Sequence, residues 1–203
     1  MSNQKRIGAV VTAAGLSTRM KAFKQTLPIG GKSMVEHVVL RFEAVGADPI
    51  VVVTGYRGKE VRRALADRQV TFLENPDFET TQMFDTVRIG LNYIQGLCDR
   101  VFITPVDVPL FSVDTLCREI GTDGDVIIPE ESGVTGHPVL IDTAVLPAIL
   151  TYSGDRGLRG AIENSGAETV YVSIQDQGAM LDADTQDDYR ELLHYYDKSG
   201  RTE

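Results

Sequence analysis

The sequence predicts a three-layer α/β domain built on a mostly parallel sheet. Short β-branched runs alternate along the chain with longer amphipathic runs, which is typical of β–α–β units. The run Ile50–Val53 is apolar throughout, as expected for a strand that is buried on both faces. With 203 residues, of which 42% are hydrophobic and 24% charged, the chain has the size and composition of one domain with its own core.

The expected strands and helices follow one another in alternation. Strands are predicted where β-branched and aromatic residues cluster between turn residues, at 6–11, 50–54, 70–74, 100–104, 125–128, 137–141 and 169–173. Helices are predicted where apolar residues recur at helical spacing, at 33–45, 57–67, 83–96, 112–120, 143–151, 156–164 and 185–196. We expect a single domain over residues 1–196 and a flexible tail over 197–203.

Several of these helices start at residues that favour helix caps. Ser33, Ser112 and Asp184 each precede a predicted helix, and their side chains can accept hydrogen bonds from N–H groups of the first turn. Asp187 and Asp188 then fall in the first turn of the last helix, where acids interact favourably with the helix dipole.

The overall charge limits the classes of partner. The chain has 29 acidic and 20 basic residues and a formal net charge of −9. Nucleic acids and acidic membranes need a basic surface, so neither is expected as a partner. We find no apolar run of the length of a signal peptide or a membrane span and expect a cytoplasmic protein.

One loop departs from this acidic character. The stretch from Thr12 to Gln25 carries Arg19, Lys21 and Lys24, and no Asp or Glu occurs before Glu36. This loop follows the first strand directly, and parallel sheets bind ligands beyond the carboxyl ends of their strands. Backbone N–H groups with lysine and arginine are what a polyphosphate requires. The loop is therefore predicted to bind an anionic ligand.

Two common phosphate-binding loops do not fit. The dinucleotide fingerprint needs three glycines in the order GxGxxG, and only Gly15 is present. The P-loop pattern would use Gly31-Lys32-Ser33 but requires a glycine at position 26, where the chain has Thr26. The segment around Gly31 is instead typical of a turn followed by a helix cap.

The loop does resemble a third type. Its residues Ala13-Ala14-Gly15-x-Ser17-x-Arg19-Met20, followed by Lys24, resemble the signature of MobA-like nucleotidyltransferases, and most of all that of the molybdenum cofactor cytidylyltransferases. Further blocks resemble the family in the same order: Asn75-Pro76, Met83-x-x-Thr86-Val87-Arg88-x-Gly90, Pro105-Val106-Asp107-Val108-Pro109, Gly136-His137-Pro138-Val139-Leu140, Gly154-Asp155-Arg156-Gly157-x-Arg159 and Leu181 to Tyr189. Lys21, Gln82 and Phe84 depart from it, standing where the family usually has glycine, glycine and serine.

The resemblance implies a Rossmann-like nucleotidyltransferase domain and a reaction. A nucleoside monophosphate would pass from CTP, or from GTP, to the phosphate of molybdopterin with Mg²⁺ as cofactor, and pyrophosphate would leave. It also implies a molybdoenzyme as client. Two alternatives remain open: transfer to another acceptor, such as a sugar phosphate or methylerythritol phosphate, and a non-catalytic nucleotide-binding chaperone for cofactor maturation.

The resemblance further assigns residues to roles. It implies catalysis by Arg19, Lys24 and Asp107, nucleotide binding by these three with Ala13, Ala14, Gly15 and Thr86, metal binding by Asp107 with Asp184 or Asp182, and acceptor binding by Gly136, His137 and Arg159. Guanylyl-transferring relatives typically have a second glycine after the first alanine, so Ala14 favours CTP. Several residues also have a purely structural interpretation: Asp107 as a turn residue, Asp184 as a helix cap, His137 at a strand start and Arg159 on a helix surface.

Overall fold

A computed structural model describes residues 5–20 and 22–200 and confirms the α/β fold. The central sheet has the strand order β10-β7-β9-β6-β1-β4-β5, with β8 paired to β7. The strands are β1 (Ile7–Ala13), β4 (Ile50–Thr54), β5 (Thr71–Glu74), β6 (Arg100–Pro105), β7 (Val126–Glu131), β8 (Val134–Thr135), β9 (Val139–Asp142) and β10 (Thr169–Ser173). A separate hairpin joins β2 (Pro28–Ile29) and β3 (Lys32–Ser33).

The sheet is mostly parallel. Strand β1 pairs in parallel with both β4 and β6, and the pairs β4–β5 and β7–β10 are also parallel. Strand β9 is antiparallel to β6 and β7. The connection from β7 sets the direction of β9, because it is too short for the crossover that a parallel neighbour requires.

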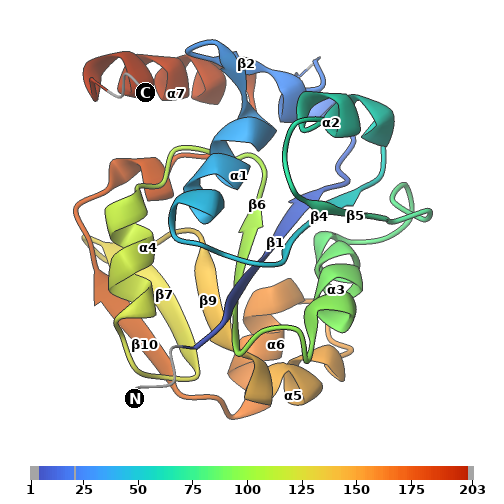
Figure 1. Cartoon of the computed structure of the whole chain (residues 1–203), viewed down its shortest axis with the longest axis vertical. Helices are drawn as coiled ribbons and strands as arrows, with labels where there is room; N and C mark the ends of the chain where they lie inside the picture. Colours follow the sequence, from blue (N-terminus) through green and yellow to red (C-terminus); the bar gives the residue numbers. More distant parts are fainter. Residues whose placement is uncertain (1–4, 21, 201–203) are drawn as a thin grey trace.

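Helices cover both faces of the sheet (Figure 1). They are α1 (Met34–Ala44), α2 (Gly58–Ala64), α3 (Met83–Ile94), α4 (Val113–Ile120), α5 (Leu146–Leu150), α6 (Gly157–Ser165) and α7 (Gln186–Lys198). Helices α3, α5 and α6 pack on one face, while α1, α2, α4 and α7 contribute to the core on the other. The predicted three layers are therefore present.

The alternation of side chains along the strands builds the two cores. In β1, Val11 belongs to the core under α1, and its neighbour Val10 belongs to the core under α3. In β4, Val52 and Val53 divide between the two cores in the same way. Successive strand residues point to opposite faces, so an apolar run with helices on both sides buries every side chain.

The predicted elements are found close to their expected positions, with two differences at caps and ends. Ser33 and Ser112 are the caps of α1 and α4, as predicted. The cap of α7, however, is Thr185 in a reciprocal capping box with Asp188, so the prediction of Asp184 as the cap is wrong. Helix α7 continues to Lys198, into the segment predicted as a tail, and residues 201–203 of that tail lie outside the described residues.

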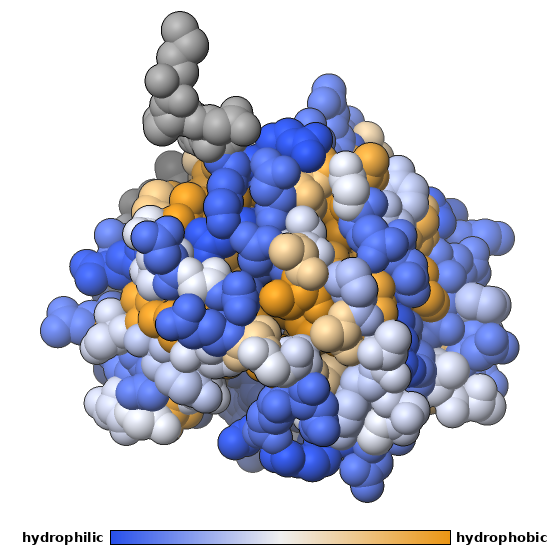
Figure 2. Space-filling view, turned by 90° about the horizontal axis from the view of Figure 1, so that it is seen from below, coloured by the Kyte–Doolittle hydropathy of each residue, from blue (hydrophilic) through white to orange (hydrophobic). Residues whose placement is uncertain are grey.

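The end of the molecule at the amino ends of the strands has a mixed surface. Figure 2 shows hydrophobic residues there in separate patches between hydrophilic ones. Within the described chain, no helix combines the length and the apolar character that crossing a membrane requires.

Candidate active site

The candidate site lies where the strand order switches direction. Strand β4 follows β1 on one side, and β6 lies on its other side, so the carboxyl end of β1 opens into a crevice. Thr12 is opposite Pro105 in the β1–β6 pair, and the Val106 N–H donates to the Thr12 carbonyl at 3.1 Å. This contact places the residues after β6 beside the cationic loop after β1.

Gln25 and Ser17 hold the loop in shape. The buried Gln25 amide donates from Nε2 to the Gly15 carbonyl at 2.8 Å, and the Ser17 hydroxyl donates to Gln25 Oε1 at 3.0 Å. The same hydroxyl accepts the Lys24 N–H at 3.3 Å. Ser17 has a φ of 54°, in the left-handed region that costs energy for a residue other than glycine. The network therefore fixes the backbone on both sides of Lys24.

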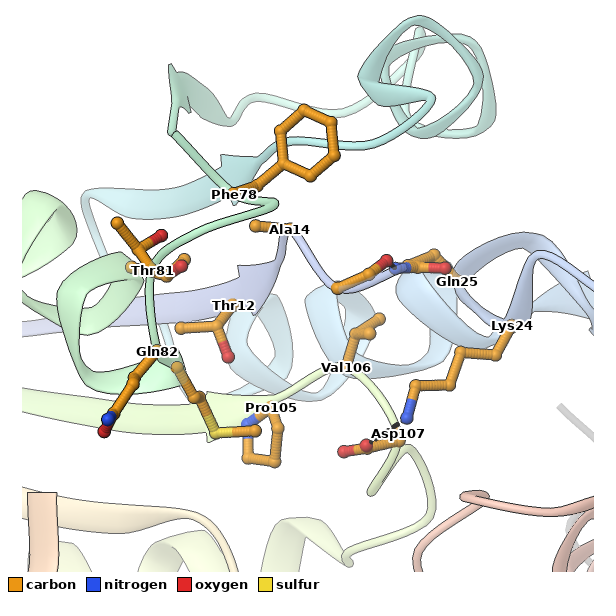
Figure 3. Close-up of a pocket in the computed structure, with 13 residues that line it drawn as sticks. Thr12, Ala14, Lys24, Gln25, Phe78, Thr81, Gln82, Pro105, Val106 and Asp107 are labelled. Carbon is orange, nitrogen blue, oxygen red and sulfur yellow. Dashed lines mark hydrogen bonds and ion pairs between the residues drawn. The ribbon is translucent and has the colours of Figure 1, made fainter. Parts of the chain in front are cut away.

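Lys24 joins two carboxylates from distant parts of the chain. Its Nζ lies 2.5 Å from Asp107 Oδ2 and 3.1 Å from Asp184 Oδ1. Arg19 contacts the other Asp184 oxygen at 2.8 Å. The Lys24 and Asp107 side chains are only 13% and 10% exposed, whereas Arg19 is 69% exposed at the rim. Figure 3 shows the ammonium group pointing at Asp107.

A backbone contact brings the last acidic segment into the site. The Ala183 N–H donates to the Asp107 carbonyl at 3.0 Å, and Asp182 and Asp184 on either side line the same pocket as Lys24. Because Thr185 caps α7, Asp184 is free to face the site. The two carboxylates thus share one side of an extended segment, as their spacing predicts.

The charges in the cluster shift the pKa values of their neighbours. Burial alone would lower the pKa of Lys24, but the charge of Asp107 and the hydrogen bonds to both carboxylates outweigh it, so the pKa is raised. Burial opposes ionisation of Asp184 as well, yet the contacts from Lys24 and Arg19 lower its pKa. The pKa of Asp182 is raised by burial and by the nearby charges of Asp184 and Asp107. The shifts favour the charged forms of Lys24 and Asp184, which are therefore an ion pair at neutral pH.

Three pockets adjoin one another at this end of the sheet. We name these pockets after the roles that the family resemblance predicts for residues in them. The first, the nucleoside pocket, is lined by Thr12, Ala14, Gly15, Lys24, Gln25, Phe78, Thr81, Gln82, Met83, Thr86, Pro105, Val106 and Asp107. The second, the phosphate pocket, is lined by Gly15 to Arg19, Lys24, Met83, Pro105, Asp107, Val108, His137, Asp182 and Asp184. The third, the acceptor pocket, is lined by Ile128, Thr135, Gly136, His137, Val139, Leu158, Arg159, Ile162, Glu163, Thr169 and Tyr171. Lys24 and Asp107 lie between the first two, and His137 lies between the last two.

The nucleoside pocket is closed on one side by the segment before α3. The Asn75 amide donates to both Thr81 and Thr86 at 3.0 Å, which fixes this segment against the helix. In Figure 3, Phe78 and Ala14 lie on one side of the pocket, and the Gln82 side chain points away from Phe78. Phe84, the other departure from the family pattern, is buried under Arg88 and lines none of these pockets. Its effect on the nucleoside pocket is therefore indirect.

The glycines at positions 15 and 136 differ in their surroundings. A Cβ added to Gly15 would meet no atom of the protein within 4 Å, so this position opens onto the pocket. A Cβ at Gly136 would lie 2.4 Å from the Ala179 carbonyl oxygen and 2.6 Å from Met180 Sδ. The chain's own packing therefore requires Gly136, and close approach of a ligand to its backbone is not needed to explain it.

His137 and Arg159 both line the acceptor pocket, but they differ in burial and in their partners. The Nδ1 atom of His137 is buried and has no hydrogen-bond partner within the described chain, and burial lowers the pKa of the imidazole. A neutral ring therefore faces the pocket at neutral pH. Arg159 is exposed on α6 and pairs with Glu163 at 3.1 Å, so an anionic ligand would compete with this carboxylate.

Some residues of the site did not emerge from the sequence, and some predicted ones lie elsewhere. No motif in the sequence marks Gln25, Phe78 or Thr81 as site residues. The one available signal is that Gln25 directly follows Lys24, which was predicted. Ala13 is buried in the core under α1 and lines none of the three pockets. Lys21 lies outside the described residues.

The carboxylates fit a divalent cation only in part. Oxygens of Asp107 and Asp184 converge on a single cationic atom, which is the arrangement that a hard metal ion would also use. Over residues 5–20 and 22–200, no three His, Cys, Asp or Glu side chains are grouped closely enough to hold a metal. Phosphate oxygens would have to complete such a site, as is usual for Mg²⁺.

A cationic loop at the switch point of a mostly parallel sheet faces a carboxylate after the neighbouring strand, an arrangement suited to a ligand with phosphate groups. The chain belongs to the MobA-like NTP transferase family, whose domain model matches residues 9–170. The family resemblance found in the sequence is thereby confirmed, and the protein is a nucleotidyltransferase.

Similar proteins support this class. A molybdenum cofactor cytidylyltransferase from Escherichia coli strain K12 is 29% identical over 189 residues, covering 90% of this chain and 93% of that protein. A nucleotidyl transferase structure from Methanothermobacter thermautotrophicus superposes with a TM-score of 0.84 at 25% identity, covering 96% of this chain and 99% of the other.

Two further solved structures share the fold at lower identity. A 4-diphosphocytidyl-2C-methyl-D-erythritol synthase from Anaerococcus prevotii has a TM-score of 0.80 at 15% identity, covering 96% of this chain and 97% of the other. A manganese complex of a Mycobacterium tuberculosis protein has a TM-score of 0.74 at 23% identity, covering 93% of this chain and 98% of the other.

Proposed function

We propose that this enzyme transfers CMP from CTP to the phosphate of molybdopterin, with Mg²⁺ as its metal. The observation that carries the proposal is the convergence of Lys24, Asp107 and Asp184 between a nucleoside pocket and a phosphate pocket. The similarity to the molybdenum cofactor cytidylyltransferase over nine-tenths of the chain supports the choice of substrates.

The chemical problem is the attack of one anion on another. An acceptor phosphate oxygen forms a bond to the α-phosphorus of the nucleotide, the bond from that phosphorus to the bridging oxygen breaks, and pyrophosphate leaves with the electron pair. The protein has to align the reactants and neutralise charge in such a reaction. Lys24 supplies a buried positive charge for this purpose, and Arg19 supplies a planar donor at the rim.

Asp107 and Asp184 are the residues that would hold the metal, with Asp182 close by in the same pocket. A bound divalent cation would neutralise phosphate oxygens and fix their positions. The manganese complex of a protein with the same fold supports the choice of a divalent ion. The open position at Gly15 lets a phosphate chain approach the loop closely.

The preference for CTP rests on the size of the nucleoside pocket. The Ala14 side chain lines this pocket and takes space that a glycine would leave to a larger base. We expect faster turnover with CTP than with GTP at matched concentrations, measured as pyrophosphate release. Equal or faster turnover with GTP would overturn the base assignment and leave the enzyme class intact.

The lining of the acceptor pocket favours an acceptor with a flat ring system. Five of its lining residues, Ile128, Val139, Leu158, Ile162 and Tyr171, provide apolar or aromatic surface, and Arg159 stands at its edge. Methylerythritol phosphate is a competing acceptor, because a synthase of its cytidylyl derivative shares the fold. Methylerythritol phosphate and sugar phosphates have no flat ring to place against these walls, which favours molybdopterin.

A panel of CTP, GTP, ATP and UTP against molybdopterin, methylerythritol phosphate and a sugar phosphate tests the proposal. Pyrophosphate release should be highest with CTP and molybdopterin, and a cytidylylated product should appear in mass spectra. Product with another acceptor and none with molybdopterin would reassign the substrate. Nucleotide binding without pyrophosphate release from any pair would favour the chaperone alternative, with a molybdoenzyme as its client.

A further inference from the structure

Lys24 occupies two carboxylate oxygens that a metal ion between Asp107 and Asp184 could also use. Its Nζ contacts Asp107 Oδ2 at 2.5 Å and Asp184 Oδ1 at 3.1 Å, so the ammonium group bridges the two side chains. The contact is enclosed, because the Lys24 and Asp107 side chains are almost buried. Solvent therefore screens this ion pair much less than a pair on the surface.

If the ammonium group and a divalent cation both bind these oxygens, their positive charges repel each other. A divalent ion binds carboxylate oxygens at about 2.0–2.6 Å, which is close to the distance already taken by Nζ. Two positive centres on one oxygen pair would lie within a few ångströms and repel each other strongly in an enclosed site. A metal that binds Asp107 Oδ2 and Asp184 Oδ1 therefore competes with Lys24 for these two oxygens.

A nucleotide offers Lys24 another anionic partner. Its side chain lines both the nucleoside pocket and the phosphate pocket, so phosphate groups in either one are within its reach. Arg19 differs, because it is exposed, lines only the phosphate pocket and contacts the other Asp184 oxygen at 2.8 Å. The position of Lys24 between the two pockets makes it the group that can exchange carboxylates for phosphates.

We infer that Lys24 acts as an internal counter-ion that keeps divalent metal off Asp107 and Asp184 until a nucleotide draws it away. The inference rests on the proposed function only in taking these two aspartates as the metal ligands. Metal and nucleotide then bind with positive coupling, because each favours the state in which Lys24 has left the carboxylates. Linkage requires the coupling to be the same whichever ligand binds first.

Binding of Mn²⁺ alone tests this directly. Free Mn²⁺ is followed by electron paramagnetic resonance as it is titrated into the protein without nucleotide or acceptor. Lys24→Met should bind Mn²⁺ at least about 10-fold more tightly than the wild type, within the range usual for coupled sites. Lys24→Arg keeps the charge and should bind Mn²⁺ as weakly as the wild type. Equal Mn²⁺ affinity in wild type and Lys24→Met would overturn the inference.

The matched control is Lys5→Met. Lys5 also pairs with a carboxylate, Asp142 at 2.8 Å, but it lies on the side of the amino ends of the strands. This variant loses one positive charge and releases one aspartate without touching the site, so its Mn²⁺ affinity should stay at the wild-type value. A gain equal to that of Lys24→Met would show a general charge effect and overturn the inference.

Two further titrations complete the design. Adding a non-hydrolysable CTP analogue should raise the Mn²⁺ affinity of the wild type about 10-fold or more and raise that of Lys24→Met much less. The double variant Lys24→Met, Asp107→Asn should lose the gained Mn²⁺ affinity, and retention would place the ion elsewhere and refute the inference. No acceptor is present, so failure of molybdopterin to react would count against the proposed function alone.

Discussion

Gly15→Ala separates nucleotide binding from folding at the cationic loop. A Cβ at this position meets no protein atom within 4 Å, and the backbone of Gly15 is not in the left-handed region. Alanine should therefore fit the fold, and reduced freedom of the unfolded chain should raise stability by about 0.4–1 kcal/mol. The new methyl group would nevertheless project into the space assigned to the nucleotide.

The expected loss of activity follows from the cost of that overlap. An extra methyl group in a filled site typically costs about 1–3 kcal/mol, and each 1.4 kcal/mol is a factor of ten, so kcat/KM for the nucleotide should fall roughly 5- to 140-fold. The assay is pyrophosphate release over a range of CTP concentrations, together with thermal unfolding of the same protein. Unchanged kcat/KM in a stable Gly15→Ala protein would refute the assignment of the loop.

Gly136→Ala is the matched comparison. Its Cβ would lie 2.4 Å from the Ala179 carbonyl oxygen, a backbone atom that cannot move independently of the chain. Overpacking of this kind costs about 1–3 kcal/mol of stability. Thermal unfolding should therefore show a loss for Gly136→Ala and none for Gly15→Ala. The opposite order would mean that the packing around these two glycines has been misassigned.

Four other variants test the site and the core. Lys24→Ala should keep the fold and lower kcat by roughly 100-fold or more, since it removes a buried charge next to the reacting phosphates, and near-normal turnover would contradict this role. Asp107→Asn should reduce activity and nucleotide-dependent Mn²⁺ affinity together, with a smaller effect for Asp182→Asn; unchanged metal titration in Asp107→Asn would remove Asp107 as a ligand. Glu119 is fully buried, neither carboxylate oxygen has a hydrogen-bond partner in the described chain, and burial raises its pKa well above 4.5. Between pH 4.5 and the raised pKa, only the unfolded chain releases this proton, so stability falls as pH rises through that window. Glu119→Gln should therefore raise the unfolding free energy at pH 7 and leave it unchanged below pH 4.5, and a loss at pH 7 would show that the carboxylate is needed.

The fold was predictable because its signals are local. The apolar run Ile50–Val53 and the caps Ser33 and Ser112 depend on residues a few positions apart, which the sequence displays directly. The cap of α7 shows the limit of such signals. Asp184 and Thr185 both suit a cap, and the choice between them depends on the Ala183–Asp107 contact and on the box that Thr185 forms with Asp188.

The direction of β9 shows a similar limit. Its residues read as an ordinary strand, and nothing in their pattern distinguishes a parallel from an antiparallel neighbour. The connection through β8 decides the direction, because it is too short for a crossover. The need for glycine at position 136 was likewise not visible in the sequence, since the atoms that exclude a side chain there come from residues more than forty positions away.

By itself, the sequence determined the alternation of elements, the cationic loop and the blocks that mark the family, because each of these is written in neighbouring residues. The tertiary structure decided that Lys24 lies between Asp107 and Asp184, which are 83 and 160 positions away. That meeting depends on the parallel pairing of β1 with β6 and on the packing of the 182–184 segment against the end of β6. Distances between residues so far apart are set by how whole elements pack, and for that reason the competition between an ammonium group and a metal for the same oxygens became visible only in three dimensions.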